Sequence, residues 1–227
     1  MYKRQVYSRE TLEAIASIAR EYNLIVFADE IYDKILYDGQ QHIPMAMIAT
    51  DLLVVTFGGL SKNYRLAGFR SGWMILSGEA IDTASNYIEG LDMLANMRLC
   101  ANVPGQLAVQ TALGGYQSIN DLVKPTGRLG AQRDLVVERI NAIPGLSCYK
   151  PAGAIYVFVK MDERFNISDD EQMVLDLLQQ ENILVVQGSG FHLQTSNYFR
   201  LVFLPHRDVL EDACDRIERF FSTYRQL

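Results

Sequence analysis

The sequence predicts an α/β protein with a larger domain over residues 1–120, built on a mainly parallel sheet, and a smaller α+β domain over residues 121–227. Two short, wholly apolar segments, residues 24–28 and 52–57, have the composition of strands buried on both faces of a parallel sheet. Segments with helical spacing of apolar residues alternate with these strands. The composition then shifts, and we place the domain boundary between residues 118 and 125.

The larger domain is expected to begin with a helix over residues 8–22, because Ser8 is a suitable N-cap. Apolar residues recur at helical spacing within it and form one face, which consists of Leu12, Ile15, Ile18 and Ala19. Strands are then predicted at residues 24–28, 52–57 and 69–76. They are followed by predicted helices at residues 79–97 and 104–113.

A long helix over residues 118–143 is expected next, although Pro125 and Gly127 weaken its start. Three strands are predicted beyond it, at residues 154–159, 183–186 and 198–203. Two helices are predicted at residues 169–181 and 207–224. The segment Gln187–Gly190 resembles a phosphate cradle, but glycine clusters more often form plain loops, and a loop is expected here.

Composition excludes several classes of function. The net charge of −6 over 227 residues disfavours a nucleic-acid partner, since such domains usually carry a basic face. No apolar run approaches the ~20 residues of a membrane span, and no secretory signal is recognisable. Cys100, Cys148 and Cys214 lack disulfide or metal spacing, and neither they nor the three histidines predict a metal site. The cysteines are expected to be reduced core thiols of a cytoplasmic protein.

Charged residues follow the two apolar strands at the points where these end. Asp29 comes directly after the first strand, and Tyr32 lies three residues further on. Lys62 follows the second strand, and Arg70 lies eight residues beyond it. Because ligands of open α/β sheets bind outside the carboxyl ends of the strands, we expect these four side chains to share one site.

Each of these side chains has a role if the ligand is pyridoxal phosphate. The lysine amine can form a Schiff base with the aldehyde of the cofactor. Asp29 can keep the ring nitrogen protonated, which makes the ring an electron sink. Tyr32 can hydrogen-bond the phenolate oxygen. Arg70 can bind the phosphate through two parallel hydrogen bonds.

The segments "FADEIYDKILYDG" and "TFGGLSKNYRLAGFRSGWM" resemble the fold-type-I, class-I aminotransferases, whose D-x-x-Y and S-K-x(7)-R motifs match at Asp29/Tyr32 and Ser61-Lys62…Arg70. The segment "YFRLVF" is similar to the family strand whose arginine clamps the substrate α-carboxylate, which implies that role for Arg200. The resemblance extends from about Val6 to the C-terminus. Within the family, "YIEGLDMLANMRLCANVPGQLAVQTALGGYQSI" is most similar to the bacterial glutamate–pyruvate (alanine) aminotransferases.

Two features depart from the family pattern. A Ser or Thr that bonds the phosphate often precedes the lysine by three residues, where this chain has Gly59; Ser61 is the candidate substitute. The family's upstream part, including a glycine-rich phosphate loop, has no counterpart here, and residues 1–5 look foreign. We therefore expect the C-terminal part of a longer enzyme that forms a homodimer when complete. The chain by itself is expected to be poorly soluble, because its sheet would have an exposed edge.

The resemblance implies an aminotransferase that exchanges an amino group between an L-amino acid and a 2-oxo acid, with alanine and 2-oxoglutarate as the expected pair. Lys62 would act as general base and acid, and Arg200 would orient the substrate. Three alternatives stay open: a cofactor-binding regulatory module, a carbon–sulfur lyase, and an inactive fragment. For Arg200, the alternative is an ion pair with an acid such as Asp208.

Overall fold

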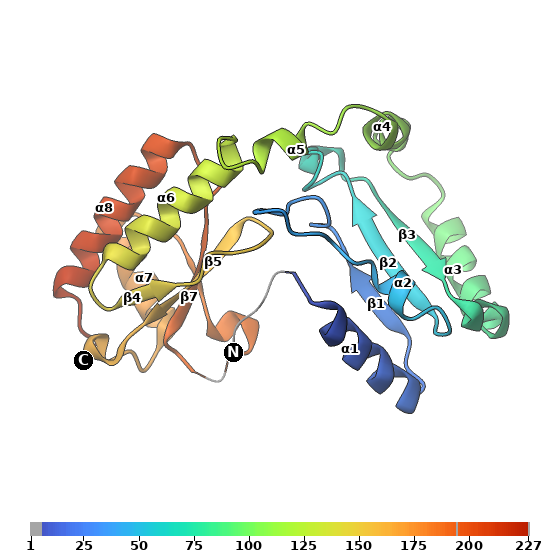
Figure 1. Cartoon of the computed structure of the whole chain (residues 1–227), viewed down its shortest axis with the longest axis horizontal. Coiled ribbons are helices and arrows are strands. Elements are labelled where there is room, and N and C mark those ends of the chain that lie inside the picture. Colours follow the sequence, from blue (N-terminus) through green and yellow to red (C-terminus); the bar gives the residue numbers. More distant parts are fainter. Residues whose placement is uncertain (1–5, 194, 227) are drawn as a thin grey trace. The chain divides into compact units, whose positions relative to one another are not determined.

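The computed structural model describes residues 6–193 and 195–226. It consists of two compact units, Val6–Asn120 and a second unit that begins at Asp121. Figure 1 labels the helices and strands of both units. Short apolar strands and amphipathic helices alternate in the first unit, so the predicted α/β class is confirmed.

The first unit begins with helix α1 (Arg9–Glu21), which the sequence predicts correctly. The side chain of Ser8 accepts a hydrogen bond from the Thr11 backbone N–H at 3.3 Å and so caps the helix. The buried face consists of Leu12, Ala16 and Ala19. The expected face is wrong in part, because Ile15 and Ile18 are exposed. Leu12 and Ala16 pack with Met45 of α2 (Met45–Ile48) and with Val54 of the sheet.

Three strands form the sheet of the first unit in the order β1-β2-β3 (Figure 1). Strand β1 (Val26–Asp29) pairs in parallel with β2 (Val54–Gly59), from Val26 opposite Val54 to Asp29 opposite Phe57. Strand β3 (Gly72–Ser77) runs antiparallel to β2. The part of the sheet that the described residues form thus has one parallel pair, β1 with β2, and one antiparallel pair, β2 with β3. The carboxyl ends of β1 and β2 lie at the same edge of this sheet.

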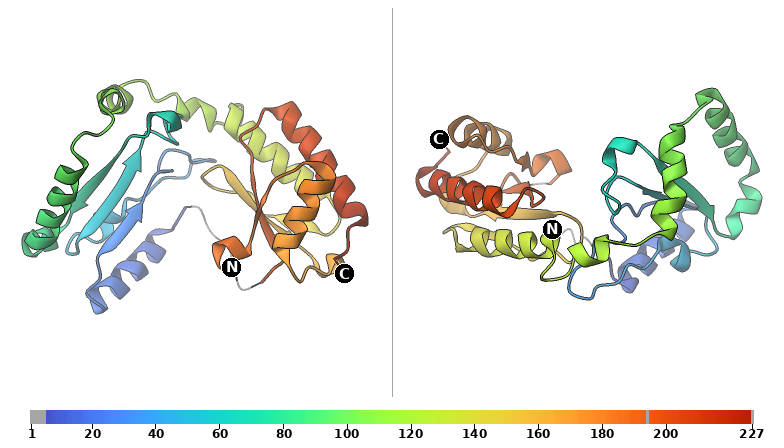
Figure 2. Two further views of the ribbon diagram at one scale, coloured as in Figure 1. Left: turned by 180° about the vertical axis from the view of Figure 1, so that it is seen from behind. Right: turned by 90° about the horizontal axis from the view of Figure 1, so that it is seen from above.

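The helices that follow β3 are drawn in green in Figure 2. They have almost no buried residues. The predicted helix over residues 79–97 is instead a 3-10 helix, η2 (Glu79–Thr83), followed by α3 (Ser85–Arg98). Helix α4 (Val103–Gly114) begins after Asn102, whose side chain accepts a hydrogen bond from the Gly105 backbone N–H at 3.2 Å. Helix α3 has no buried residue, and in α4 the buried residue is Gly105.

The expected long helix over residues 118–143 is broken into α5 (Ile119–Leu122) and α6 (Arg128–Ala142). The break falls at the residues that weakened the prediction. Proline has no backbone N–H to donate. Gly127 has an extended backbone, with φ −77° and ψ 158°. A Cβ on Gly127 would lie 2.1 Å from the carbonyl oxygen of Asp121, so this close approach requires glycine.

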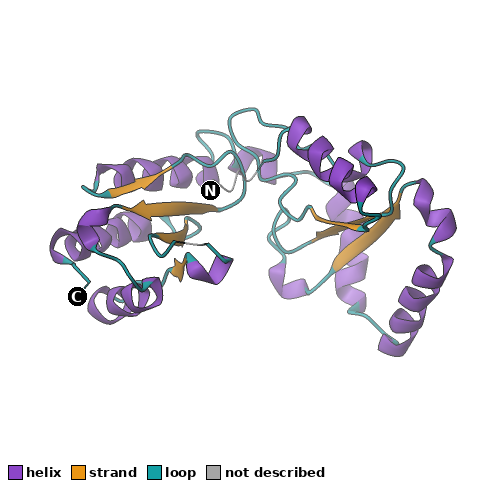
Figure 3. Cartoon of the chain, turned by 90° about the horizontal axis from the view of Figure 1, so that it is seen from below, coloured by secondary structure: helices purple, strands orange, loops and turns teal. Residues whose placement is uncertain are grey.

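The second unit has a four-stranded antiparallel sheet in the order β4-β5-β7-β6. Figure 3 draws the strands of both units in orange. Its strands are β4 (Leu146–Cys148), β5 (Tyr156–Met161), β6 (Val186–Gln187) and β7 (Tyr198–Val202). The sequence analysis did not predict β4, and it placed β6 mostly too early. Asn182 ends helix α7 in a left-handed conformation, and the chain reaches β7 only at Val186.

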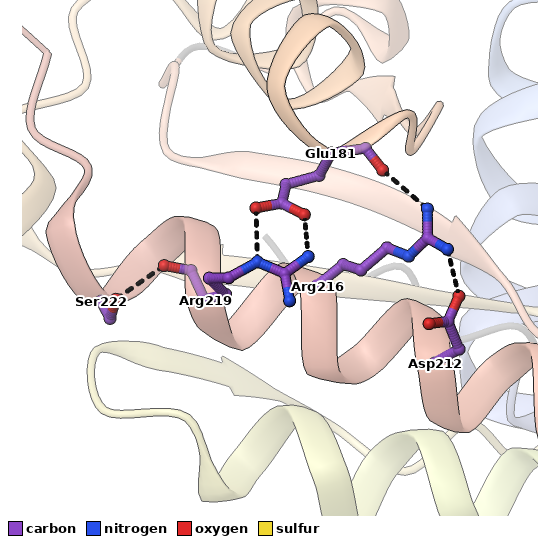
Figure 4. Close-up of polar contacts among 5 residues, drawn as sticks. All are labelled: Glu181, Asp212, Arg216, Arg219 and Ser222. Carbon is purple, nitrogen blue, oxygen red and sulfur yellow. Dashed lines mark hydrogen bonds and ion pairs between the residues drawn. The ribbon is translucent and has the colours of Figure 1, made fainter.

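Helix α6 and helix α7 (Asp170–Glu181) pack against this sheet. Helix α8 (Arg207–Thr223) packs against both of them. Figure 4 shows how the end of α7 is joined to α8. The Glu181 carboxylate accepts a hydrogen bond from Arg219 Nε at 2.9 Å, and its carbonyl oxygen accepts one from Arg216 at 3.3 Å. Arg216 also pairs with Asp212 at 2.8 Å. These contacts fix the helix pair that carries much of the second core.

The expectation of three core thiols is wrong for Cys100, which is exposed. Burial raises the pKa of the Cys148 and Cys214 thiols to about 11 each, so both are protonated and unreactive at neutral pH. Within residues 6–193 and 195–226, every helix is too short or too polar to cross a membrane.

Candidate active site

Asp29 is the last residue of β1, and its side chain is exposed at the carboxyl edge of the sheet. Its Oδ1 accepts a hydrogen bond from the Ile31 backbone N–H at 3.3 Å. The chain stays attached to β2 for one more residue, because the Glu30 N–H donates to the Phe57 carbonyl at 3.0 Å. The carboxylate is therefore fixed where β1 and β2 end together.

Lys62 and Tyr32 are brought together at this edge. The loop after β2 is closed by the Leu60 N–H, which donates to the Ser71 carbonyl at 3.0 Å, and by the Leu66 N–H, which donates to the Leu60 carbonyl at 3.0 Å. Within this loop, Lys62 Nζ lies 5.9 Å from the centroid of the Tyr32 ring, at the outer limit of a cation–π contact. Two loops that are distant in sequence thus place an amine beside a phenol.

The loops after β1 and β2 are also joined by residues that the sequence analysis did not single out. Asn63, the neighbour of Lys62, is almost fully buried, and its Nδ2 donates a hydrogen bond to Oδ1 of Asp33. This bond holds the backbone next to the lysine. Asp33 belongs to the acidic segment after β1, and this cluster of acids can be recognised in the sequence. Its pairing with Asn63 depends on the folded path of the chain.

Glu30 and His42 form a second contact that stabilises the loop after β1. His42 Nε2 lies 3.0 Å from Glu30 Oε2, and Glu30 Oε1 accepts a hydrogen bond from the Met45 backbone N–H at 2.8 Å. The hydrogen bond with Glu30 raises the pKa of His42 above its ordinary value. Burial acts to raise the pKa of Glu30, but the hydrogen bonds from His42 and Met45 outweigh it, so that pKa is lowered.

The structure explains why glycine stands at residue 59. A Cβ on Gly59 would lie 3.2 Å from the Ser71 carbonyl oxygen, 3.3 Å from the Gly72 Cα and 3.3 Å from the Ile31 side chain. A serine there would require β3 to shift by a few tenths of an ångström. The hydroxyl of Ser61 lies in the loop, half-buried, and has no hydrogen-bond partner among the described residues. Ser61 therefore has a hydroxyl that the described part of the chain leaves without a partner.

Arg70 lies at the far end of the same loop, just after the 3-10 helix η1 (Ala67–Phe69). Its backbone is left-handed, with φ +49°. Its guanidinium is exposed, and Nη1 donates to the Ala67 carbonyl at 2.8 Å. Among the described residues, no hydrogen bond, ion pair or ring contact joins it to Lys62 or Tyr32. The turn is held by Asn102, whose Nδ2 donates to the Phe69 carbonyl at 2.6 Å.

The donor set at this edge is suited to an anionic ring cofactor such as pyridoxal phosphate. Lys62, Asp29 and Arg70 form no ion pair with any described residue, so their charges are not neutralised by the chain itself. The set supplies an amine, a carboxylate, a phenol, a hydroxyl and a guanidinium. These are the groups that the aldehyde, ring nitrogen, phenolate and phosphate of the cofactor require.

Arg200 lies on β7 of the second unit, opposite Phe158 of β5 and Val186 of β6. Its guanidinium carbon is 4.3 Å from the Tyr156 ring centroid and 4.5 Å from that of Phe191. Its Nε is buried and has no hydrogen-bond partner in the described chain. The alternative of an ion pair with Asp208 is not found among the described residues. The guanidinium is therefore held by aromatic rings, and within the described part of the chain it is not paired with an acid.

Comparisons with known proteins identify the family of this chain. The family model for aminotransferase class I and II matches residues 5–217. This chain therefore belongs to the class I and II aminotransferase family, and the predicted resemblance is confirmed.

Individual relatives show which members of the family this chain is similar to. The glutamate-pyruvate aminotransferase AlaA of Haemophilus influenzae is 59% identical over 222 residues, which are 97% of this chain and 55% of that protein. The crystal structure of an aminotransferase from Escherichia coli superposes with a TM-score of 0.95 at 58% identity, over 98% of this chain and 55% of that one. An alanine aminotransferase from Pyrococcus furiosus superposes with a TM-score of 0.86 at 38% identity, over 95% of this chain and 54% of that one. The chain thus spans about half the length of these relatives.

Proposed function

We propose that this chain carries the cofactor lysine and the carboxylate-binding arginine of a pyridoxal-phosphate-dependent aminotransferase. The reaction is the exchange of an amino group between an L-amino acid and a 2-oxo acid, with alanine and 2-oxoglutarate giving pyruvate and glutamate. The proposal is supported by family membership, since class I aminotransferases use this cofactor. The choice of substrates is supported by the 59% identity to a protein described as a glutamate-pyruvate aminotransferase.

The observation that carries the proposal is the position of Lys62 beside Tyr32, with Asp29 at the end of the neighbouring parallel strand. When bound, pyridoxal phosphate supplies an electron sink for a bond broken at the substrate Cα. Asp29, Tyr32, Ser61 and Arg70 hold the cofactor through its ring nitrogen, phenolate and phosphate. Homodimer formation by the whole enzyme remains an expectation from the family.

Lys62 is the catalytic residue of this proposal. Its amine takes the proton from the substrate Cα as a general base and returns a proton as a general acid, a role typically worth about 10²–10⁴-fold in rate. Arg200 binds the substrate α-carboxylate through two parallel, charge-assisted hydrogen bonds. Its buried Nε, which lacks a hydrogen-bond partner in the described chain, is one donor available for this contact.

The test is a titration with pyridoxal phosphate, made on the chain itself and on Lys62→Ala. Lys160→Ala is the matched control, because Lys160 is an exposed lysine on β5 of the other unit. We expect a cofactor absorbance band that borohydride fixes to the peptide containing Lys62, in the parent and in the control only. Equal labelling of the parent and Lys62→Ala would refute the assignment of Lys62.

Activity is then measured in the protein as its gene encodes it, with alanine and 2-oxoglutarate. Lys62→Ala should lower kcat by at least about 10²–10⁴-fold. Cofactor binding without turnover of any amino acid would favour the regulatory alternative. Release of pyruvate from a sulfur amino acid without an oxo acid would favour the lyase.

A further inference from the structure

Arg200 has an environment that needs an explanation. An arginine side chain carries about 2 kcal/mol of rotamer entropy, and a hydrogen bond or ion pair usually restricts it. Here Nε has no partner among the described residues, and the guanidinium packs instead against the rings of Tyr156 and Phe191. Tyr156 lies on strand β5, whose pairing with β7 fixes its position. Phe191 lies on a loop, so something else must hold its ring in place.

The loop that carries Phe191 is a 3-10 turn, η4 (Ser189–Phe191). The Phe191 N–H donates to the Gly188 carbonyl at 2.9 Å, and the Gly188 N–H donates to the Tyr198 carbonyl of β7 at 2.8 Å. The Phe191 ring also meets Phe158 edge-on, with ring centroids 5.2 Å apart. The turn is thus joined to the strand that carries Arg200.

Asp170 supplies the strongest attachment of this turn. Its carboxylate accepts two hydrogen bonds from Ser189, from the backbone N–H at 2.8 Å and from Oγ at 2.7 Å. Its exposed fraction is 3%, so these bonds are sheltered from water. Hydrogen bonds to a charged acceptor are stronger than those between neutral groups, and a buried carboxylate must keep them.

Asp170 is itself held rigidly. It is the first residue of α7, where the positive end of the helix dipole favours a carboxylate. The helix is capped by Asp169, whose side chain accepts from the Gln172 N–H at 3.0 Å. It is anchored by the buried side chains of Met173 and Leu177. A chain of contacts therefore links the core of the second unit to the Arg200 guanidinium. Asp170 bonds Ser189, and the neighbouring Phe191 ring packs against Arg200.

We propose that Asp170 and Ser189 are positioning residues that hold the Phe191 ring against Arg200 and so keep the guanidinium in one orientation. The proposal rests on the proposed function, in which Arg200 binds the α-carboxylate of the substrate. Loss of this support lets the guanidinium sample other rotamers, which weakens carboxylate recognition without touching the cofactor or Lys62.

The test compares two amines in the amino-donor half-reaction of the protein as its gene encodes it, loaded with pyridoxal phosphate. L-Alanine has the α-carboxylate and L-alaninamide does not, so the ratio of their second-order rate constants measures carboxylate recognition. The variants are Phe191→Leu, Ser189→Ala, Ser189→Thr and Arg200→Lys. Ser222→Ala is the matched control, because its hydroxyl donates to the Arg219 carbonyl at 2.6 Å on α8.

Phe191→Leu should lower the ratio about tenfold, which corresponds to about 1.4 kcal/mol. Ser189→Ala should also lower the ratio, but by less than tenfold. Ser189→Thr keeps the hydroxyl and should have the ratio of the parent. The rate with L-alaninamide and the cofactor content should stay at parent values, which a general structural defect would not allow. Ser222→Ala should leave the ratio unchanged.

The failures of the two proposals are distinguishable. If Arg200→Lys lowers the ratio while Ser189→Ala and Phe191→Leu leave it unchanged, the positioning role is refuted and the role of Arg200 stands. If Arg200→Lys also leaves it unchanged, both are refuted. Should Phe191→Leu fail to fold, Ser189→Ala with its Thr counterpart decides the outcome.

Discussion

The two units of this chain bury their apolar side chains very differently. Among the described residues, most buried apolar side chains belong to the second unit, and most exposed large ones belong to the first. Phe199 and Phe203 of the second unit are fully buried, whereas Phe27 on β1 of the first unit is 59% exposed. Helices α3 and α4 have almost no buried residues. The second unit therefore has a core of its own, and the first has an apolar surface that its own elements leave uncovered.

The difference has a consequence for the site. In the first unit, Asp29, Tyr32 and Lys62 lie at the strand ends and in the loops that follow them, where substitution changes chemistry more than packing. In the second unit, Arg200 lies on a central strand and is held through a loop attached to the core. Under the proposed function, catalysis could thus be altered in the first unit at little cost in folding, while binding of the substrate carboxylate in the second would be coupled to its packing.

The largest effect is expected from a matched pair of phenylalanines. Phe199→Ala should lower the free energy of unfolding of the second unit by about 3–5 kcal/mol, because it leaves a cavity in a dense core. Phe27→Ala should change that of the first unit by less than about 0.5 kcal/mol, because most of its ring is exposed. Urea unfolding checks both values. Trp73 on β3 is the single tryptophan, so its fluorescence reports on the first unit, and circular dichroism reports on both.

Equal costs for the two phenylalanine substitutions would break the comparison. That outcome would mean that the Phe27 ring is covered in solution.

A smaller effect is expected from the apolar surface of α3. Leu94 and Met97 are 63% and 77% exposed, and such surfaces promote association. We expect the chain to self-associate in sedimentation velocity, and Leu94→Glu with Met97→Glu to shift it toward the monomer. The matched control replaces Leu175 and Leu184, exposed leucines of the second unit, with glutamate. An equal shift in the control would show that added charge alone is responsible.

The smallest effect is expected from the His42–Glu30 pair. A raised histidine pKa means that the folded chain binds this proton more tightly than the unfolded chain. The stabilisation is therefore complete below the ordinary histidine pKa of 6.5 and is lost as the pH rises through the raised pKa. Glu30 has a lowered pKa, so its contribution to stability is present at higher pH. This contribution is lost as the pH falls through the lowered pKa of Glu30.

His42→Gln should consequently be less stable than the parent near pH 6, by at most about 1 kcal/mol, and should approach the parent near pH 9. Urea unfolding followed by Trp73 fluorescence at the two pH values measures this. A difference that is the same at both would show that His42 contributes by packing and not by charge.

Local signals account for most of the elements that were predicted correctly. The Ser8 cap and the apolar spacing after it predict α1 within one residue at each end, because a helix start depends on neighbours in sequence. The break between α5 and α6 was signalled by Pro125 and Gly127. Strand β4 could not be predicted, because three residues carry too little periodicity and its pairing with β5 is not local.

In the candidate site, too, some features follow from local sequence and others only from the tertiary structure. The sequence by itself determined the family, and it singled out Asp29, Tyr32, Lys62 and Arg70, because the order of strands and the spacing of motifs are written along the chain. Only the tertiary structure decided that Lys62 stands beside Tyr32, that Asn63 bonds Asp33, and that Asp170 and Ser189 hold Phe191 against Arg200. The physical reason is that these contacts join segments about 10 to 30 residues apart, and no local propensity specifies which side chains meet once the sheets have formed.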